Sequence, residues 1–222
     1  MLISHKHKFI TIDIPKTGTT SLVHFLSSLG VVDFEGCANS CDRHGKARFV
    51  KFLFEKWYKD LYYWGDYKKF CIVRDPWKRY LSYYVYRKNT AQEYRSASNK
   101  DLESWNRRRL FQGRSCSKWL SKFSSDSEGL KETVKIMNPQ YAFIHDNNGS
   151  LMVDYIANTE NIEVDIKNFL KITGIKCDLE FPSRNKSEYD KPYHQYFNQE
   201  IIDMIAEKEK WVIDKFGYTF RE

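Results

Sequence analysis

Two compact apolar runs organise the first third of the chain, and a helical pattern follows each of them. Residues 9–14 and 69–73 are short, apolar and rich in β-branched or aromatic side chains, which is typical of buried strands. Apolar side chains then recur at helical spacing over residues 22–29 and again over residues 77–84. This alternation predicts strand–helix units, in which parallel strands pair in one sheet.

The remaining pattern continues the alternation. Residues 88–101 are polar and poor in aliphatic side chains, so we expect a surface excursion there. Because buried strands alternate with helices, the fold class is α/β, with a central parallel sheet flanked by helices on both faces. The other predicted elements are short strands at 31–34 and 151–156 and helices at 49–57, 162–170 and 198–216.

The amino-acid composition excludes fewer classes of function than the pattern of hydrophobic and polar positions does. Hydrophobic residues make up 41% and aromatic residues 16% of the 222 residues, so a packed core is expected and general disorder is excluded. Lys and Arg number 36 against 29 Asp and Glu, a formal charge of +7 that suits an anionic ligand but is equally compatible with simple solubility. The five cysteines are odd in number and scattered, which favours a reducing compartment over a disulfide framework or a zinc site.

The segment Pro15–Ser21 carries the strongest chemical signal. It places Lys16, Gly18 and three hydroxyl-bearing Thr residues in a turn between a predicted strand and a predicted helix. Such a turn directs backbone N–H groups, hydroxyls and an ammonium group at one point, as phosphate-binding loops do. It is not a Walker A loop, because Lys16 precedes Gly18. Arg74 follows the second strand, so it is expected at the same carboxyl edge of the sheet, where ligands of such folds bind.

With these two motifs, the chain resembles the sulfotransferases that use 3′-phosphoadenosine 5′-phosphosulfate (PAPS), and most of all the carbohydrate branch with the chondroitin, dermatan and 2-O heparan enzymes. Residues 15–21 match the 5′-phosphosulfate loop of that family, and residues 72–84 match its 3′-phosphate motif. The resemblance implies the P-loop-NTPase-like sulfotransferase fold and a single domain over residues 1–222. Residues of about 88–140 match weakly and are expected to be a variable insertion on the acceptor side.

The resemblance also implies roles for individual residues. Lys16 is expected to stabilise the departing phosphate, and Arg74 with Ser82 to bind the 3′-phosphate, unless Arg74 pairs with Asp75 instead. His44 is the candidate general base. Its rivals are the carboxylates Asp33 and Glu35, and Arg184 and Lys186 are weaker candidates for closing over the nucleotide. The expected 5′-phosphosulfate contacts are Pro15, Lys16, Thr17, Gly18, Thr19, Thr20 and Ser21.

The expected reaction is metal-independent sulfuryl transfer from PAPS to a hydroxyl group of a glycan, with PAP as product. Two alternatives stay open: a small-molecule kinase, which would need Mg²⁺ at Thr17, and a non-enzymatic polyanion-binding module. Five basic residues at 107–109, 114 and 118 are either contacts for an anionic glycan or a solvated helix face. No nucleic-acid partner and no membrane span are expected. The protein is predicted to be cytoplasmic, or a soluble catalytic domain cut from a membrane-anchored Golgi-type enzyme.

Overall fold

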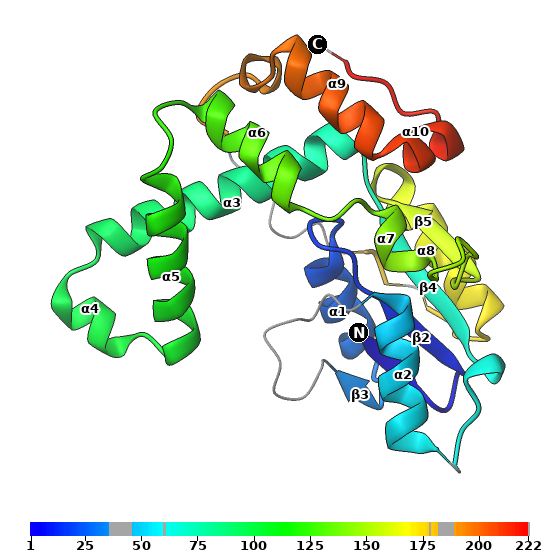
Figure 1. The fold of residues 1–222 in the computed structure, drawn as a ribbon. Helices are drawn as coiled ribbons and strands as arrows, with labels where there is room; N and C mark the ends of the chain where they lie inside the picture. Colours follow the sequence, from blue (N-terminus) through cyan, green and yellow to red (C-terminus); the bar gives the residue numbers. More distant parts are fainter. Residues whose placement is uncertain (36–45, 60, 178, 182–188, 222) are drawn as a thin grey trace. The chain divides into compact units, whose positions relative to one another are not determined.

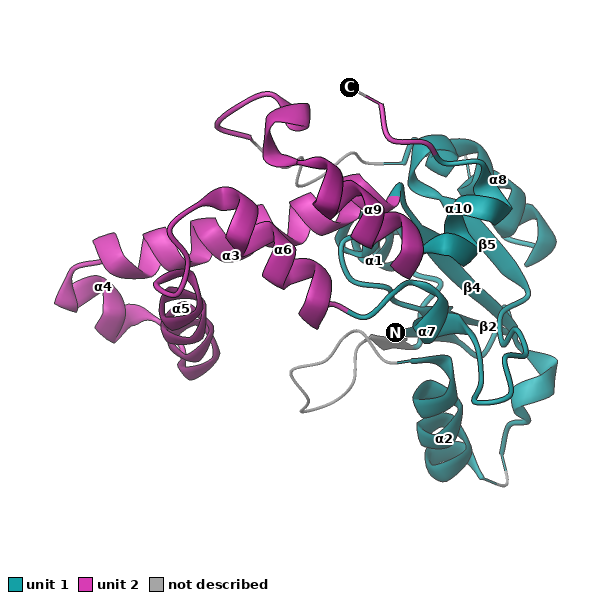
Figure 2. Ribbon diagram, turned by 45° about the horizontal axis from the view of Figure 1, so that its top comes forward, with its two compact units in different colours: residues 1–75, 138–186, 209–218 teal, residues 76–137, 187–208, 219–222 magenta. Residues whose placement is uncertain are grey.

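The computed structural model describes residues 1–35, 46–59, 61–177, 179–181 and 189–221, except the side chains of residues 34 and 35. The chain divides into two compact units (Figure 2). The first comprises residues 1–75, 138–186 and 209–218, and the second comprises residues 76–137, 187–208 and 219–222. No helix in the described part of the chain is long and apolar enough to cross a membrane.

The first unit is built on one sheet whose strands lie in the order β3-β1-β2-β4-β5 (Figure 1). Strands β2, β4 and β5 are parallel, as the sequence predicts, whereas β1 is antiparallel to both of its neighbours. Strand β1, which forms an N-terminal hairpin with β2, is therefore an addition to the predicted sheet. The strands are β1 (Leu2–Ser4), β2 (Phe9–Ile12), β3 (Phe34–Glu35), β4 (Lys68–Val73) and β5 (Tyr155–Asn158).

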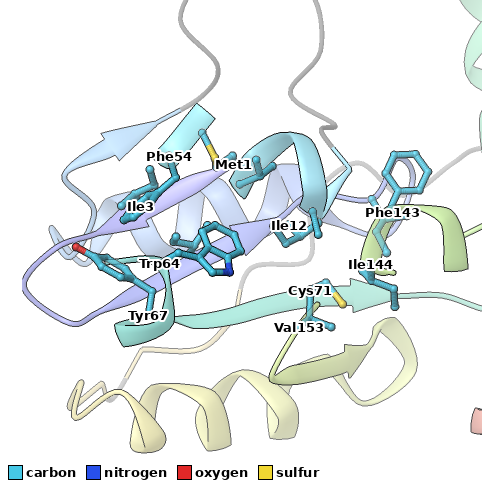
Figure 3. Packing of buried hydrophobic residues seen from close by; sticks show 14 of the residues in the cluster. Met1, Ile3, Ile12, Phe54, Trp64, Tyr67, Cys71, Phe143, Ile144 and Val153 are labelled. Carbon is cyan, nitrogen blue, oxygen red and sulfur yellow. The ribbon is translucent and has the colours of Figure 1, made fainter. Parts of the chain in front are cut away.

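Helices cover both faces of this sheet, which confirms the predicted α/β class. Side chains alternate along β4, so that Phe70 and Ile72 pack in one apolar cluster while Cys71 and Val73 pack in another. The first cluster includes side chains of α1 (Thr19–Ser28) and α8 (Ile162–Ile172). The second, drawn in Figure 3, includes side chains of α2 (Ala47–Tyr58), α7 (Tyr141–Ile144) and α10 (Lys210–Phe216), together with the 3₁₀ turn η1 (Trp64–Asp66).

The second unit is helical. Its longest helix, α3 (Pro76–Ser96), packs against α5 (Arg107–Leu120), α6 (Asp126–Ile136) and α9 (Gln199–Lys208). The Asp126 carboxylate on α6 accepts hydrogen bonds from Tyr84 (2.5 Å) and Lys88 (3.0 Å) of α3, which ties these two helices together. The unit also contains α4 (Asn99–Ser104) and the 3₁₀ turn η3 (Tyr193–Tyr196).

Four sequence predictions are corrected by the observed elements. Residues 88–96 were expected to form a surface excursion, but they are the last part of α3. Their polar side chains fit this helix because most of them are exposed or only half-buried there. The short strand expected at 31–34 is β3 at 34–35, and the strand expected at 151–156 is β5, which begins at Tyr155. The single helix expected over 198–216 is α9 and α10, which are separated at Glu209.

Candidate active site

The turn between β2 and α1 has an unusual backbone. Lys16 has a φ of 68° and Gly18 a φ of 87°, so two residues of one short turn occupy the left-handed region. Glycine adopts this conformation freely, but for a lysine it costs of the order of 1–3 kcal/mol. Strain of this kind persists where the surrounding structure enforces it, and it is concentrated at ligand-binding sites.

Thr17 holds this turn in place. Its side chain is fully buried, and its hydroxyl group donates a hydrogen bond of 2.9 Å to the carbonyl oxygen of Ile14. The Thr17 hydroxyl therefore stabilises the loop from inside. Gly18 is the N-cap of α1 and the first turn of that helix carries no acidic side chain, so the positive end of the helix dipole begins at the loop.

Lys16 and Arg74 lie together at the carboxyl edge of the sheet. The Arg74 guanidinium, at the end of β4, donates from Nη1 to the carbonyl oxygen of Lys16 at 3.2 Å. Burial, with a further contribution from the positive charge of Arg74, lowers the pKa of Lys16 to about 8. Within the described part of the chain no carboxylate pairs with the Arg74 guanidinium, so the alternative of an Arg74–Asp75 ion pair is not observed. An anion bound here would offset the repulsion between the two cations.

The backbone of Arg74 is clamped by a buried amide side chain. Gln140 accepts a hydrogen bond from the Arg74 N–H through Oε1 and donates one to the Arg74 carbonyl oxygen through Nε2, both at 2.9 Å. Gln140 is itself held by the carboxylate of Glu209, which accepts from the Gln140 N–H at 3.1 and 3.2 Å. Gln140 and Glu209 are both almost completely buried, so their positions are fixed. The backbone of Arg74, and with it the starting direction of the Arg74 side chain, is therefore fixed as well.

A third strand end joins this arrangement through the 3₁₀ turn η2 (Thr159–Asn161), which follows β5. The Thr159 hydroxyl lies 2.9 Å from the carbonyl oxygen of Val73 and 3.4 Å from that of Thr17. The neighbouring Glu160 carboxylate accepts from the Asp75 N–H at 3.3 Å and from the Tyr218 hydroxyl at 2.8 Å. The ends of β2, β4 and β5 are thus connected around Lys16 and Arg74.

Gln140, Thr159 and Glu209 were not predicted as site residues. Each is a single polar residue without a repeated spacing, and the hydrogen bonds that it makes are visible only in the folded chain. The one sequence signal is at Thr159, which stands directly after a predicted strand, at the edge where the site was expected.

The predicted site residues divide into three groups. Lys16 and Arg74 lie together at the carboxyl edge of the sheet, and the loop that contains Lys16 leads directly into α1. Ser82 is buried on α3, in the second compact unit. His44, Arg184 and Lys186 lie outside the described residues, and the side chain of Glu35 is not described either.

Asp33, the other rival for the general base, lies toward the opposite edge of the sheet. Its carboxylate accepts from the His5 N–H at 2.5 Å, and its own N–H donates to Ile3 at 2.9 Å. His5 directly follows Ser4, which is paired with Phe9 at the start of β2. The length of β2, roughly 10 Å at about 3.3 Å per residue, therefore separates Asp33 from the end that carries the Lys16 loop.

The fold and the loop define an α/β protein with a lysine-bearing turn at the carboxyl edge of its parallel strands, beside Arg74. A model of the Sulfotransferase family matches residues 1–212, which is nearly the whole chain, and the chain therefore belongs to this family. Its members transfer sulfuryl groups, so the protein is a sulfotransferase. A search of curated proteins found no match.

Proposed function

We propose that this protein transfers a sulfuryl group from PAPS to a hydroxyl group of a carbohydrate. The observation that carries the proposal is the convergence of Lys16 and Arg74 at one edge of the sheet, in a chain of the Sulfotransferase family. Two cations held on a strained loop and a clamped strand end suit a nucleotide with phosphate groups at two positions. The carbohydrate acceptor rests on the resemblance to the carbohydrate branch.

Lys16 acts at the bond that breaks. The acceptor oxygen forms a bond to sulfur while the bond from sulfur to the bridging oxygen of the 5′-phosphate is cleaved, and the electron pair of that bond leaves with PAP. A protonated Lys16 beside the bridging oxygen stabilises the negative charge that develops there. The 5′-phosphate lies against the Pro15–Ser21 loop at the N-terminus of α1, where it accepts hydrogen bonds from the backbone N–H groups of Thr17 and Gly18.

Arg74 binds the 3′-phosphate as a bidentate partner, and Ser82 supplies a hydroxyl group to the same phosphate. Gln140 contributes indirectly, because it fixes the backbone from which the Arg74 side chain projects. This arrangement distinguishes PAPS from ATP, which has no 3′-phosphate.

His44 takes the proton that the acceptor hydroxyl loses, and Glu35 is the remaining rival for this role. Arg184 and Lys186 close over the bound nucleotide. The proposed compartment is the cytoplasm, and the alternative is that the chain is a soluble catalytic domain cut from a membrane-anchored Golgi-type enzyme. Among the described residues, Cys71, Cys116 and Cys177 are free thiols, which is compatible with the cytoplasm.

The kinase alternative loses support from the geometry of Thr17. A P-loop-like kinase would direct this hydroxyl group at Mg²⁺, directly after the loop lysine. Here the hydroxyl is fully buried and donates to Ile14. We therefore do not carry this alternative further.

The test is PAPS turnover over a panel of glycans, with mass detection of the sulfated product and with EDTA present. Lys16→Ala should abolish product formation, and Lys167→Ala, an exposed lysine on α8, is the matched control. Near-normal turnover in Lys16→Ala would remove the assigned role. For the base, His44→Ala should lose kcat while Glu35→Gln keeps it, and the reverse result would move the assignment to Glu35.

A further inference from the structure

The net positive charge of the chain is concentrated in one short segment. Residues 87–122 contain ten Lys and Arg but only three Asp and Glu, an excess of seven. Because the formal charge of the whole chain is +7, the other 186 residues are balanced. The segment covers the last part of α3, all of α4 and α5 and the turn after α5, all of them in the second unit (Figure 2).

Helix α5 of this segment has an inner face, which packs against α3, and an outer face, which is exposed. Gly113, Cys116 and Trp119 are buried, and an added Cβ atom at Gly113 would collide with the Tyr94 ring of α3, so this is the side that packs against α3. At about 100° per residue, the opposite side of the helix carries a separate set of residues within one arc. This outer face consists of Arg107, Arg108, Phe111, Arg114 and Lys118, all of which are exposed.

Most charges of the outer face have no carboxylate partner in the part of the chain that the structure describes. Helix α5 contains no acidic residue, and its first turn carries Arg107, Arg108 and Arg109 at the end where the helix dipole already favours anions. Arg109 pairs with Glu93, but among the described residues no carboxylate pairs with Arg107, Arg108 or Lys118. A charge distribution that weakens its own helix indicates an anionic partner outside the chain.

Phe111 gives the outer face a second property. Its side chain is 72% exposed at the centre of the arc, with basic residues on both sides. One exposed phenyl ring among several cations suits an anionic bilayer surface, because the ring has an apolar region to enter while the cations stay at the lipid phosphates.

We propose that the outer face of α5 binds the anionic headgroup surface of a lipid bilayer. Bilayer binding suits these side chains better than recognition of one glycan does, because among residues 1–35, 46–59, 61–177, 179–181 and 189–221 no side-chain hydrogen bond or ion pair fixes Arg107, Arg108 or Lys118 in one direction. A lateral array of mobile phosphates needs no such fixed geometry, and it gives Phe111 an apolar region to enter. This proposal goes beyond the sulfuryl-transfer function and does not rest on it.

The test is sedimentation of the full chain with phosphatidylcholine vesicles, with and without phosphatidylglycerol, in about 0.1 M salt. We expect binding only to the vesicles that contain phosphatidylglycerol, and weaker binding at higher salt. The triple variant Arg107→Gln, Arg114→Gln and Lys118→Gln should bind about 100-fold more weakly, at roughly fivefold for each cation. The variant Phe111→Ser should bind about tenfold more weakly.

The matched control removes the same charge elsewhere. Lys167, Lys171 and Lys176 are exposed in the first unit, and their triple change to Gln should weaken vesicle binding far less. All substituted side chains are exposed, so circular dichroism should show unchanged folding in each variant. Equal losses in the two triple variants, or equal binding to neutral and anionic vesicles, would overturn the proposal. So would heparin binding that is tighter than vesicle binding and insensitive to Phe111→Ser, which would assign the face to a soluble polyanion.

Discussion

The side chain of Gln140 holds the backbone of Arg74 on both sides, accepting from its N–H and donating to its carbonyl oxygen at 2.9 Å each. Both partners belong to the first compact unit, and Gln140 is completely buried. The residue proposed to bind the 3′-phosphate is thus positioned by a side chain that comes from a distant part of the sequence.

Replacement of Gln140 by Leu should therefore act on nucleotide binding as well as on stability. It leaves the N–H and the carbonyl oxygen of Arg74, which are part-buried, without these partners, at up to about 1–3 kcal/mol each. We expect a lower free energy of unfolding and a PAP affinity that falls about tenfold, measured by denaturant titration and calorimetry.

The conservative variant Gln140→Glu keeps the acceptor for the Arg74 N–H but loses the donor, so an intermediate PAP affinity is expected. Gln92→Leu, at an exposed position on α3, is the control and should change neither property. A loss of stability in Gln140→Leu without any change in the PAP affinity of the folded protein would contradict a positioning role.

Arg74→Lys should remove the preference for a 3′-phosphate. A lysine keeps the charge but cannot form a bidentate pair, so PAP should lose affinity while 5′-AMP is bound as before. The ratio of the two dissociation constants is the measurement. Arg48→Lys, at an exposed arginine of α2, is the control. If the ratio in Arg74→Lys stays at the wild-type value, Arg74 does not bind the 3′-phosphate.

The pKa of Lys16 predicts a pH dependence of nucleotide binding. Burial and the nearby Arg74 charge lower this pKa to about 8, so free protein loses the Lys16 charge as the pH rises through that value. PAP affinity should decline above about pH 8, and Lys16→Ala should bind more weakly with a flatter profile between pH 7 and 9. A wild-type profile that is level over this range would show that the charge of Lys16 does not contribute to binding.

The same pKa has a consequence for the stability of the unliganded protein. Between about pH 8 and the ordinary lysine pKa of 10.5, the unfolded chain binds more protons at this residue than the folded chain does. The Lys16 contribution to stability therefore increases as the pH rises through this window. In Lys16→Ala this increase should be absent from the pH dependence of the free energy of unfolding, and an identical pH dependence in the two proteins would contradict it.

Thr159→Val tests the connection between the strand ends. It removes the hydroxyl group near the carbonyl oxygens of Val73 and Thr17, so we expect a stability loss of about 0.5–1.5 kcal/mol and a weaker affinity for PAP. Thr173→Val is a matched control, because the Thr173 hydroxyl bonds carbonyl groups at the end of α8 instead. Equal PAP affinities in the two variants would show that Thr159 does not support the site.

Much of the fold follows from local patterns in the sequence. β2 and β4 are buried on both faces, so they appear as short continuous apolar runs, and both were predicted. β1 was missed because Leu2–Ser4 is too short to show a period and gains its stability from pairing with β2. The break between α9 and α10 was missed because Glu209, an ordinary helical residue by sequence, is buried there against the backbone of Gln140.

The candidate site was predictable to a similar extent. Lys16 and Arg74 stand directly after strands, and the rule that parallel strands end at one edge brings them together. The supporting residues were not predictable, because the side chains of Gln140 and Thr159 act through hydrogen bonds to backbone carbonyl and N–H groups, and such bonds have no sequence signature. The concentration of charge on α5 was visible in the sequence, but its exposed face became defined only once Gly113, Cys116 and Trp119 were placed against α3.

Calorimetric titration of the wild-type protein with PAP and with 5′-AMP, in the presence of EDTA, tests the central claim most directly. We predict that PAP binds without metal and at least about 100-fold more tightly than 5′-AMP, because an arginine–phosphate pair and the Lys16 loop act on the same nucleotide. Equal affinities for the two nucleotides, or no binding of PAP, would contradict the proposed sulfate-donor site.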